Sequence, residues 1–290
     1  MRVRHVSRKN VLIPAAVVFT AGILGPLFAG TLLMWPHRHP VRLPAGFART
    51  EVSFASGSGA VLRGNLLKGT PGRGVVILMH GVRGHRGEMA GHAEFLHKAG
   101  YSVLLFDFQA HGESSGSRIT SGYLESLDAR AAVDFVRREF PGEKVGVLGV
   151  SLGGVAVVLA EPALKIDAAV LELVYADIER AVKNRMAIVL GDWARPLSWL
   201  LTCQLKPRIG VGPERFDCVA RMPRLTCPKL FIAGANDRHA RLADSKMLFA
   251  AGSEPKELWV VKGAQHQNIH AMVPGEYERR VLGFLEKKLN

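Results

Sequence analysis

Short apolar runs alternate with helical patterns along most of this chain, and this alternation constrains the fold more than any other feature. The runs lie at residues 75–79, 102–106, 144–148, 168–174, 230–233 and 257–261. Helical patterns lie at residues 89–99, 123–139, 155–161, 242–251 and 276–289. Continuous apolar strands separated by helices are typical of a parallel sheet covered on both faces. The sequence therefore predicts an α/β fold with a mostly parallel sheet.

Two departures from this alternation add detail. Residues 50–54 and 60–67 have the pattern of two strands joined by a Ser/Gly turn, which predicts an antiparallel hairpin at the start of the domain. Residues 175–225 lack a strand pattern and carry apolar clusters that include Trp193 and Trp199. We expect one domain over residues 50–290, interrupted at about 175–225.

Charge and cysteine content limit the partners. The formal net charge is +13, but the basic residues form no stripe and stand beside acidic neighbours, so no nucleic-acid partner is expected. Solvated surface is the favoured reading of this charge, with attraction to an anionic membrane or an acidic substrate as the alternative. The cysteines Cys203, Cys218 and Cys227 have no metal-binding spacing, which predicts no metal site. Buried free thiols are expected, although Cys218 and Cys227 could pair in an exported domain.

The N-terminal region predicts a membrane segment. Residues 11–35 carry no charge, and a helix of that length at about 1.5 Å per residue exceeds the roughly 30 Å hydrocarbon layer of a bilayer. Basic residues 1–10 precede it and a linker, residues 36–49, follows it. We expect a single-pass signal anchor with a cytoplasmic N-terminus and an extracytoplasmic domain; the alternative is a cleaved signal and a secreted domain.

The turn Gly149-Val150-Ser151-Leu152-Gly153-Gly154 holds the candidate nucleophile. It follows an apolar run and precedes a helical pattern, which is the context of a nucleophile elbow, where a sharp turn presents a serine hydroxyl above the sheet. Serine is a weak nucleophile unless a base activates it. Ser151 therefore needs a histidine oriented by a carboxylate.

Candidate partners follow later strands. Asp237 comes after the run at 230–233 and His266 after the run at 257–261, so both fall where ligands bind in open α/β sheets. The order Ser, Asp, His is the one expected for this fold. Asp177 is the rival acid, and His80 is interpreted as a structural residue of its loop.

The developing oxyanion needs two donors. The backbone amide of Leu152, directly after the nucleophile, is one candidate, and the amide of Val82 in His80-Gly81-Val82-Arg83-Gly84 is the other.

These motifs resemble the α/β-hydrolase superfamily over residues 52–290, and the likeness is strongest to its serine-aminopeptidase-like and lysophospholipase-like branches, which include membrane-anchored members. The motifs carrying the resemblance are His80-Gly81-x-x-Gly84, Asp107-x-x-x-His111-Gly112-x-Ser114 and Gly149-x-Ser151-x-Gly153-Gly154. The resemblance implies that Asp107 and His111 are structural. It also implies that residues 175–225 form a helical cap, in which the tryptophans either cover an apolar substrate or pack within the cap.

The predicted activity is that of a serine hydrolase without a metal or organic cofactor. It would cleave a carboxylic ester or thioester of a small-molecule or lipid-like acyl substrate through an acyl-enzyme. A peptidase or amidase with the same triad is one alternative. A non-catalytic, membrane-tethered binding protein on the hydrolase fold is the other.

Overall fold

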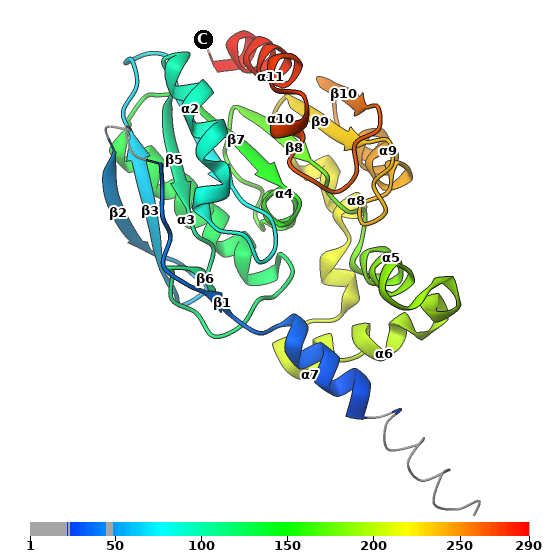
Figure 1. The fold of residues 1–290 in the computed structure, drawn as a ribbon. Coiled ribbons are helices and arrows are strands. Elements are labelled where there is room, and N and C mark those ends of the chain that lie inside the picture. The colour runs from blue at the N-terminus through cyan, green and yellow to red at the C-terminus, as the bar shows by residue number, and fades with distance from the viewer. Residues whose placement is uncertain (1–21, 23, 45–48, 290) are drawn as a thin grey trace, which may run out of the picture.

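A computed structural model describes residues 22, 24–44 and 49–289. Its centre is an eight-stranded sheet in the order β10-β9-β8-β7-β4-β5-β3-β2 (Figure 1). The strands are β2 (Thr50–Ala55), β3 (Val61–Leu67), β4 (Val75–Met79), β5 (Ser102–Phe106), β7 (Val145–Val150), β8 (Ala168–Glu172), β9 (Lys229–Gly234) and β10 (Lys256–Val261). Two short strands, β1 (His37–Arg38) and β6 (His111–Gly112), form a separate parallel pair.

Strand pairing matches the sequence prediction. The ladders that join β5, β4, β7, β8, β9 and β10 are all parallel, whereas β2 pairs with β3, and β3 with β5, in antiparallel fashion. Every residue of the central strand β4 is fully buried, as expected for a strand covered on both faces. The predicted α/β fold with an N-terminal antiparallel hairpin is confirmed.

Helices cover both faces of the sheet. One core contains side chains of α3, α4, α8 and α9, and the core on the opposite face contains side chains of α2, α10 and α11. These helices are α2 (Ala90–Lys98), α3 (Tyr123–Glu139), α4 (Leu152–Leu159), α8 (Cys218–Arg221), α9 (Leu242–Ala251), α10 (Ile269–Met272) and α11 (Pro274–Leu289). Cys218 and Cys227 are buried free thiols, and Cys203 is an exposed one.

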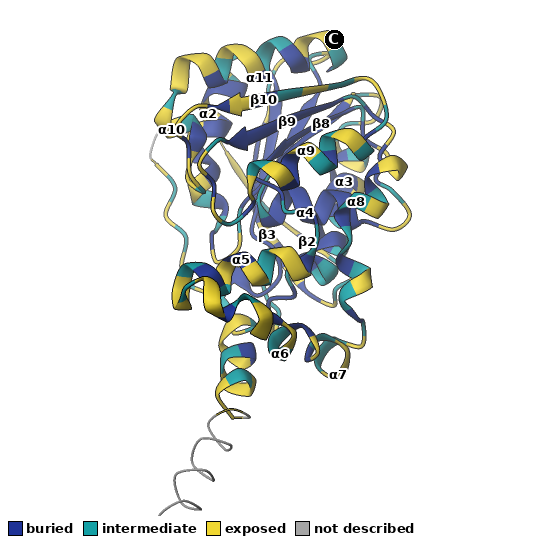
Figure 2. Ribbon diagram, turned by 90° about the vertical axis from the view of Figure 1, so that its right-hand side faces the viewer, coloured by how far each residue is buried: buried dark blue, intermediate teal, exposed yellow. Residues whose placement is uncertain are grey.

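Helical segments lie between β8 and β9 and extend beyond the sheet at one end of the molecule (Figure 1). They are α5 (Ile178–Leu190), η2 (Asp192–Ser198), α6 (Trp199–Thr202), α7 (Leu205–Ile209), η3 (Pro213–Phe216), α8 and η4 (Met222–Arg224). A further short helix, η1 (Arg86–Met89), precedes α2. Figure 2 shows that α5, α6 and α7 carry much exposed surface.

The prediction of a membrane anchor over residues 11–35 is contradicted. Among the helices that the structure describes, none is long and apolar enough to cross a membrane. Residues 24–33 are helical, and ten helical residues span only about 15 Å. The remainder of the predicted segment, residues 11–21 and 23, lies outside the described residues. The prediction of a cytoplasmic N-terminus and an extracytoplasmic domain depended on this anchor and is therefore withdrawn.

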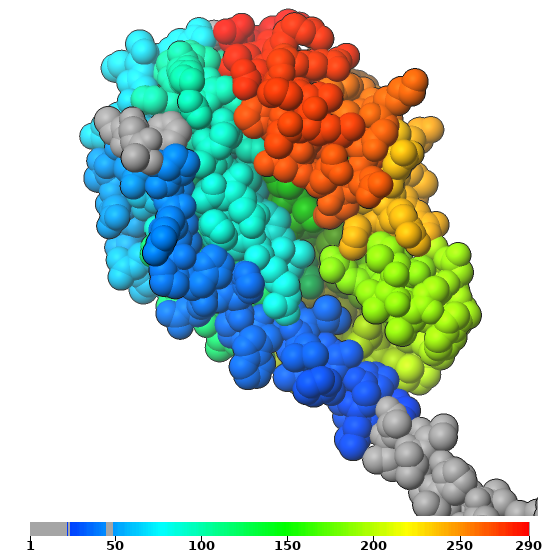
Figure 3. All heavy atoms as spheres, in the orientation of Figure 1, coloured from blue at the N-terminus to red at the C-terminus, as the bar shows by residue number. Residues whose placement is uncertain are grey.

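The helix of residues 24–33, here called the N-terminal helix, lies against α6 and α7. Arg208 donates to the carbonyl of Leu27 at 2.8 Å and to the hydroxyl of Thr31 at 3.0 Å, and Gln204 donates to the carbonyl of Pro26 at 3.0 Å. The space-filling view shows the blue N-terminal residues resting on neighbouring segments (Figure 3). These contacts bring the N-terminal helix to the region above the carboxyl ends of the strands.

Candidate active site

Loops at the carboxyl ends of three parallel strands in one half of the sheet bring the predicted triad together. Ser151 directly follows β7, Asp237 follows β9, and His266 follows β10. Parallel strands place these ends at one edge of the sheet, although the residues are separated by up to 115 positions in the chain. The site is therefore a product of the sheet topology.

The turn at Ser151 is strained and tightly packed. Ser151 has φ of 50° and ψ of −108°, a conformation that side chains rarely adopt, and its amide donates to the carbonyl of Glu172 at 2.7 Å. A Cβ at position 149 would come within 2.5 Å of the Gly154 nitrogen, and one at position 153 within 2.3 Å of the Met79 carbonyl oxygen. Glycine at these two positions lets the backbone turn sharply and present the serine hydroxyl.

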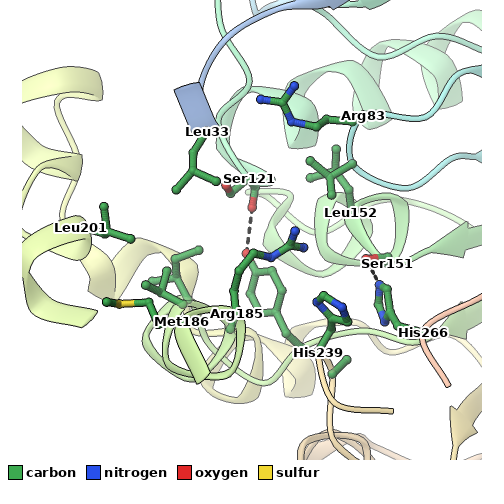
Figure 4. A pocket seen from close by; sticks show the side chains of 16 residues that line it. Leu33, Arg83, Ser121, Ser151, Leu152, Arg185, Met186, Leu201, His239 and His266 are labelled. Atoms are coloured by element: carbon green, nitrogen blue, oxygen red, sulfur yellow. Dashed lines mark hydrogen bonds between the residues drawn. The ribbon is translucent and has the colours of Figure 1, made fainter. Parts of the chain in front are cut away.

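His266 bridges the other two residues. Its Nε2 atom lies 3.1 Å from Oγ of Ser151, and its Nδ1–H donates to Oδ2 of Asp237 at 2.7 Å (Figure 4). The second oxygen of Asp237 accepts from the amides of His239 at 2.7 Å and Ala240 at 3.0 Å. A buried carboxylate held in this way fixes the imidazole tautomer that leaves Nε2 free to accept the serine proton.

The rival acid, Asp177, lies elsewhere. Its side chain caps α5 by accepting from the amide of Arg180 at 2.8 Å, and it pairs with the Arg180 guanidinium at 3.0 Å. His266 makes its carboxylate contact with Asp237 instead.

The candidate oxyanion donors flank the serine. Leu152 is the first residue of α4, where helix amides lack partners within the helix, and Val82 lines the cavity beside Ser151. Within the described residues, neither amide donates to another protein group. A Cβ at Gly81 would lie 3.8 Å from Cβ of Ser151, so the loop of Val82 passes close to the nucleophile.

The remaining motif residues hold loops in place. The Nδ1–H of His80 donates to the carbonyl of Gly81 at 2.7 Å, and its Nε2 accepts from the amide of Phe108 at 3.1 Å. Burial lowers the pKa of His80 well below its ordinary value, so its ring is neutral. Asp107 is fully buried, where it accepts from the Arg86 amide at 2.6 Å and pairs with the Arg86 guanidinium.

A cavity of about 160 Å³ opens beside Ser151 and is mainly apolar. One face of α5 lines it through residues spaced three and four apart: Ile178, Ala181, Val182, Arg185 and Met186. Leu201 of the cap and Leu33 of the N-terminal helix line it as well (Figure 4). The exposed Trp193 and Trp199 do not line it, so neither tryptophan fills the role of an apolar cover over this cavity.

A second cavity, of about 340 Å³, lies on another side of Ser151, and more polar and charged residues line it, although its exposed lining is also mainly apolar. Glu88, Gln267 and Asn268 are among the residues that line it. Figure 3 shows a hollow where green mid-chain atoms lie deep between the cyan, orange and yellow-green segments. The candidate nucleophile thus faces two spaces, the apolar cavity and a second one, here called the polar cavity for the polar and charged residues that line it.

Comparison with known proteins agrees with this geometry. The family model described as "Serine aminopeptidase, S33" matches residues 70–201. A Pyrococcus furiosus esterase, Pf2001, superposes with a TM-score of 0.70 and 25% identity, covering 87% of this chain and 100% of that one. This chain has the α/β-hydrolase fold.

Curated relatives of this α/β-hydrolase point the same way. Mouse monoglyceride lipase is 28% identical over 243 residues, which cover 71% of this chain and 78% of that protein. The Bacillus subtilis protein YqkD, described as uncharacterized, is 24% identical over 217 residues, 73% of this chain and 70% of that protein. The α/β-hydrolase described here is a serine hydrolase.

Sequence reasoning missed three residues at the site of this α/β-hydrolase: Leu33, Arg185 and His239. Arg185 left a signal, since it is a lone charge within the otherwise apolar stripe of α5 that lines the cavity. His239 and Leu33 left none that we identified. The His239 ring packs 4.9 Å from the His266 ring because the chain turns there, and Leu33 reaches the cavity only through docking of the N-terminal helix. No group of three His, Cys, Asp or Glu residues within the described ranges could hold a metal ion.

Proposed function

We propose that Ser151, His266 and Asp237 hydrolyse a carboxylic ester through an acyl-enzyme. The observation that carries the proposal is the double contact of His266, which joins Ser151 at 3.1 Å and Asp237 at 2.7 Å. A base that is oriented by a carboxylate and reaches the serine hydroxyl is what nucleophilic catalysis by serine requires.

Acylation begins when Oγ of Ser151 attacks the carbonyl carbon and its proton passes to Nε2 of His266. The bond to the leaving alcohol then breaks, and His266 returns the proton to the alcohol oxygen. Asp237 stabilises the imidazolium between these steps. The amides of Val82 and Leu152 stabilise the negative oxygen, and loss of one such donor typically costs about 100- to 1,000-fold in kcat.

Deacylation repeats the sequence with water. His266 takes a proton from the water, the resulting hydroxide attacks the acyl carbon, and the acid leaves as Ser151 recovers its proton. A thioester follows the same steps with a thiol as the leaving group.

The apolar cavity indicates the acyl group. Its volume of about 160 Å³ is close to that of an apolar protein cavity that holds one benzene molecule, about 150 Å³. A neighbouring space lined by Leu33, Val182 and Leu201 continues toward the N-terminal helix. We therefore propose that the preferred substrate is an ester with a single short or medium acyl chain. The name of the monoglyceride lipases implies a lipid-like ester for those relatives, which agrees with this proposal.

A peptidase is the second candidate, because the matching family model bears the description of an aminopeptidase. An aminopeptidase must bind the ammonium group of its substrate near the nucleophile, which calls for a free carboxylate. Arg83 and Arg185 line both cavities at the nucleophile, whereas the acids Glu88 and Glu172 line only the polar one. The positive charge beside Ser151 favours the ester substrate.

Labelling with a fluorophosphonate probe tests the proposed nucleophile. The full chain should be labelled and should hydrolyse p-nitrophenyl butyrate, and Ser151→Ala should lose both properties. Ser117→Ala is the matched control, because Ser117 is an exposed serine away from the triad. Equal labelling of the wild-type chain and Ser151→Ala would exclude Ser151 as the nucleophile.

A further inference from the structure

Two arginines lie where the apolar and polar cavities meet. Arg83, from the loop of Val82, and Arg185, from α5, line both cavities, as do Ser151 and His266. Figure 4 shows Arg185 reaching from α5 toward the side of the pocket that holds Ser151 and His266. A substrate bound at the nucleophile therefore passes this pair of positive charges.

Arg185 differs from the other arginines of α5 and η2. Arg180 pairs with Asp177 at 3.0 Å, and Arg195 pairs with Asp192 at 2.7 Å. The side chain of Arg185 makes no hydrogen bond or ion pair with any residue that the structure describes, and it is accessible to solvent. Its donors are available to a ligand.

The electrostatic surroundings leave Arg185 without a compensating charge. Partial desolvation by the surrounding protein lowers the pKa of its guanidinium, and the positive charge of Arg83 lowers it further, while no acidic residue opposes these effects. A guanidinium nevertheless stays protonated at neutral pH, because its ordinary pKa lies far above 7. Arg83 has one fixed partner, since it donates to the carbonyl of Leu32 in the N-terminal helix.

The acids near the nucleophile form no ion pair with Arg83 or Arg185 among the described residues. Asp237 uses both oxygens on His266 and on backbone amides. Glu172 is buried and also lines the polar cavity; burial raises its pKa to about 7, which favours its neutral form, and one of its oxygens accepts from Tyr277. Glu88 lines the polar cavity but forms no ion pair with Arg83 or Arg185 among the described residues.

We propose that Arg185, assisted by Arg83, binds an anionic group of the substrate, a carboxylate or a phosphate, a few bonds from the scissile carbonyl. A guanidinium matches both groups because its parallel N–H bonds can contact two oxygens at once. The inference rests on the proposed ester hydrolysis and narrows its substrate class to acidic esters. The acyl chain would occupy the apolar cavity while the anion lies at the junction of the two cavities.

Matched substrates test the preference. For the full-length chain, kcat/KM is compared between the mono-p-nitrophenyl ester of adipic acid and p-nitrophenyl hexanoate, and between a lysophosphatidate and a monoacylglycerol with the same chain. The first pair places a carboxylate on the acyl side, and the second places a phosphate on the alcohol side. We expect the wild-type enzyme to prefer the acidic member of at least one pair about tenfold, as charge-assisted contacts permit.

Variants then test whether Arg185 causes the preference for the acidic substrate. Arg185→Gln should reduce the ratio of acidic to neutral kcat/KM about tenfold, and Arg185→Lys should restore part of it because charge returns without the two-pronged geometry. Lys183→Gln is the matched control, since it removes one positive charge from the same helix but does not line either cavity. A ratio near one in both pairs for the wild-type chain, or a ratio that Arg185→Gln leaves unchanged, overturns the inference while ester hydrolysis stands.

A binding measurement separates this inference from the proposed activity. Calorimetry on full-length Ser151→Ala uses hexyl phosphate, hexanoate and hexanol as probes. Binding of an anionic probe at least about tenfold tighter than hexanol, lost in Ser151→Ala/Arg185→Gln and weakened by salt, supports the site even if no ester is hydrolysed. Equal binding of the three probes, or anion binding that survives Arg185→Gln, refutes it.

Discussion

Asp237 holds His266 through one carboxylate oxygen at 2.7 Å while its other oxygen accepts two backbone amides. Those amides belong to His239 and Ala240, and the carbonyl of His239 accepts in turn from Asn184 of α5 at 3.0 Å. The cap helix thus steadies the loop that carries the acid. The orientation of the imidazole depends on the β9 loop and on the cap together.

This relationship predicts different results for two aspartates. Asp237→Asn should lower kcat for p-nitrophenyl butyrate by about 10,000-fold, because an amide in this position favours the wrong imidazole tautomer. Asp177→Asn should change kcat less than about twofold, since asparagine also caps helices well. Steady-state kinetics of both variants, after each is confirmed as folded, measure these two losses. A larger loss of kcat in Asp177→Asn than in Asp237→Asn would identify Asp177 as the acid of the triad.

Cavity size should set the acyl preference. Met186→Trp places a larger side chain in the apolar cavity, so the ratio of kcat/KM for p-nitrophenyl octanoate to that for the acetate should fall about tenfold, within the range of about 10–200-fold that pocket fit supplies. Val189→Trp is the control, because Val189 lies on the same helix and is 71% exposed. An unchanged ratio in Met186→Trp would show that the acyl chain lies elsewhere.

The tight turn predicts a stability difference between two glycines. Gly153→Ala should destabilise the fold by about 1–3 kcal/mol or more, because the new methyl group would press on the Met79 carbonyl. Gly283→Ala should stabilise it by about 0.5–1 kcal/mol, since Gly283 lies in α11 with open space around its Cα. Urea unfolding measures both, and equal effects would contradict the close approach at position 153.

Local patterns in the sequence were enough to predict the strands, the N-terminal hairpin and the chain order of Ser151, Asp237 and His266. Each buried strand is a short apolar run, and the residues after such runs meet at one sheet edge whatever the loops do. The proposed roles of these residues, and the cap boundaries at 175–225, remain predictions that the kinetic experiments address.

Packing between distant segments could not be read from the sequence. Residues 24–33 are apolar enough to suggest a membrane, yet Leu33 faces the cavity and Arg208 binds the carbonyl of Leu27. Arg185 stands out as a lone charge in the apolar stripe of α5, but its place beside the nucleophile becomes apparent only once α5 is set beside the β7 turn. Both features depend on contacts between elements that are not adjacent in the sequence, and the bond from Arg208 to Leu27 spans 181 positions.

The buried Glu172, whose carbonyl accepts from the Ser151 amide, should make the stability of the fold depend on pH. Burial raises the pKa of Glu172 from 4.5 to about 7, although the hydrogen bond from Tyr277, 2.6 Å long, partly offsets the effect. Between pH of about 4.5 and 7 the folded chain keeps a proton that the unfolded chain releases, so the free energy of unfolding falls as pH rises through this window. The loss amounts to at most about 3 kcal/mol for this group.

Glu172→Gln removes the titration while its amide oxygen can still accept from Tyr277. Its free energy of unfolding should therefore fall less between pH 5 and 8 than that of the wild-type chain, with a difference of up to about 2.5 kcal/mol. Asp128, another buried acid whose pKa is raised to about 7, is present in both proteins and cancels in the comparison. Glu257→Gln, at an exposed position of β10, is the matched control and should follow the wild type. Parallel pH curves for the wild type and Glu172→Gln would mean that Glu172 is already ionised in the folded chain at pH 5.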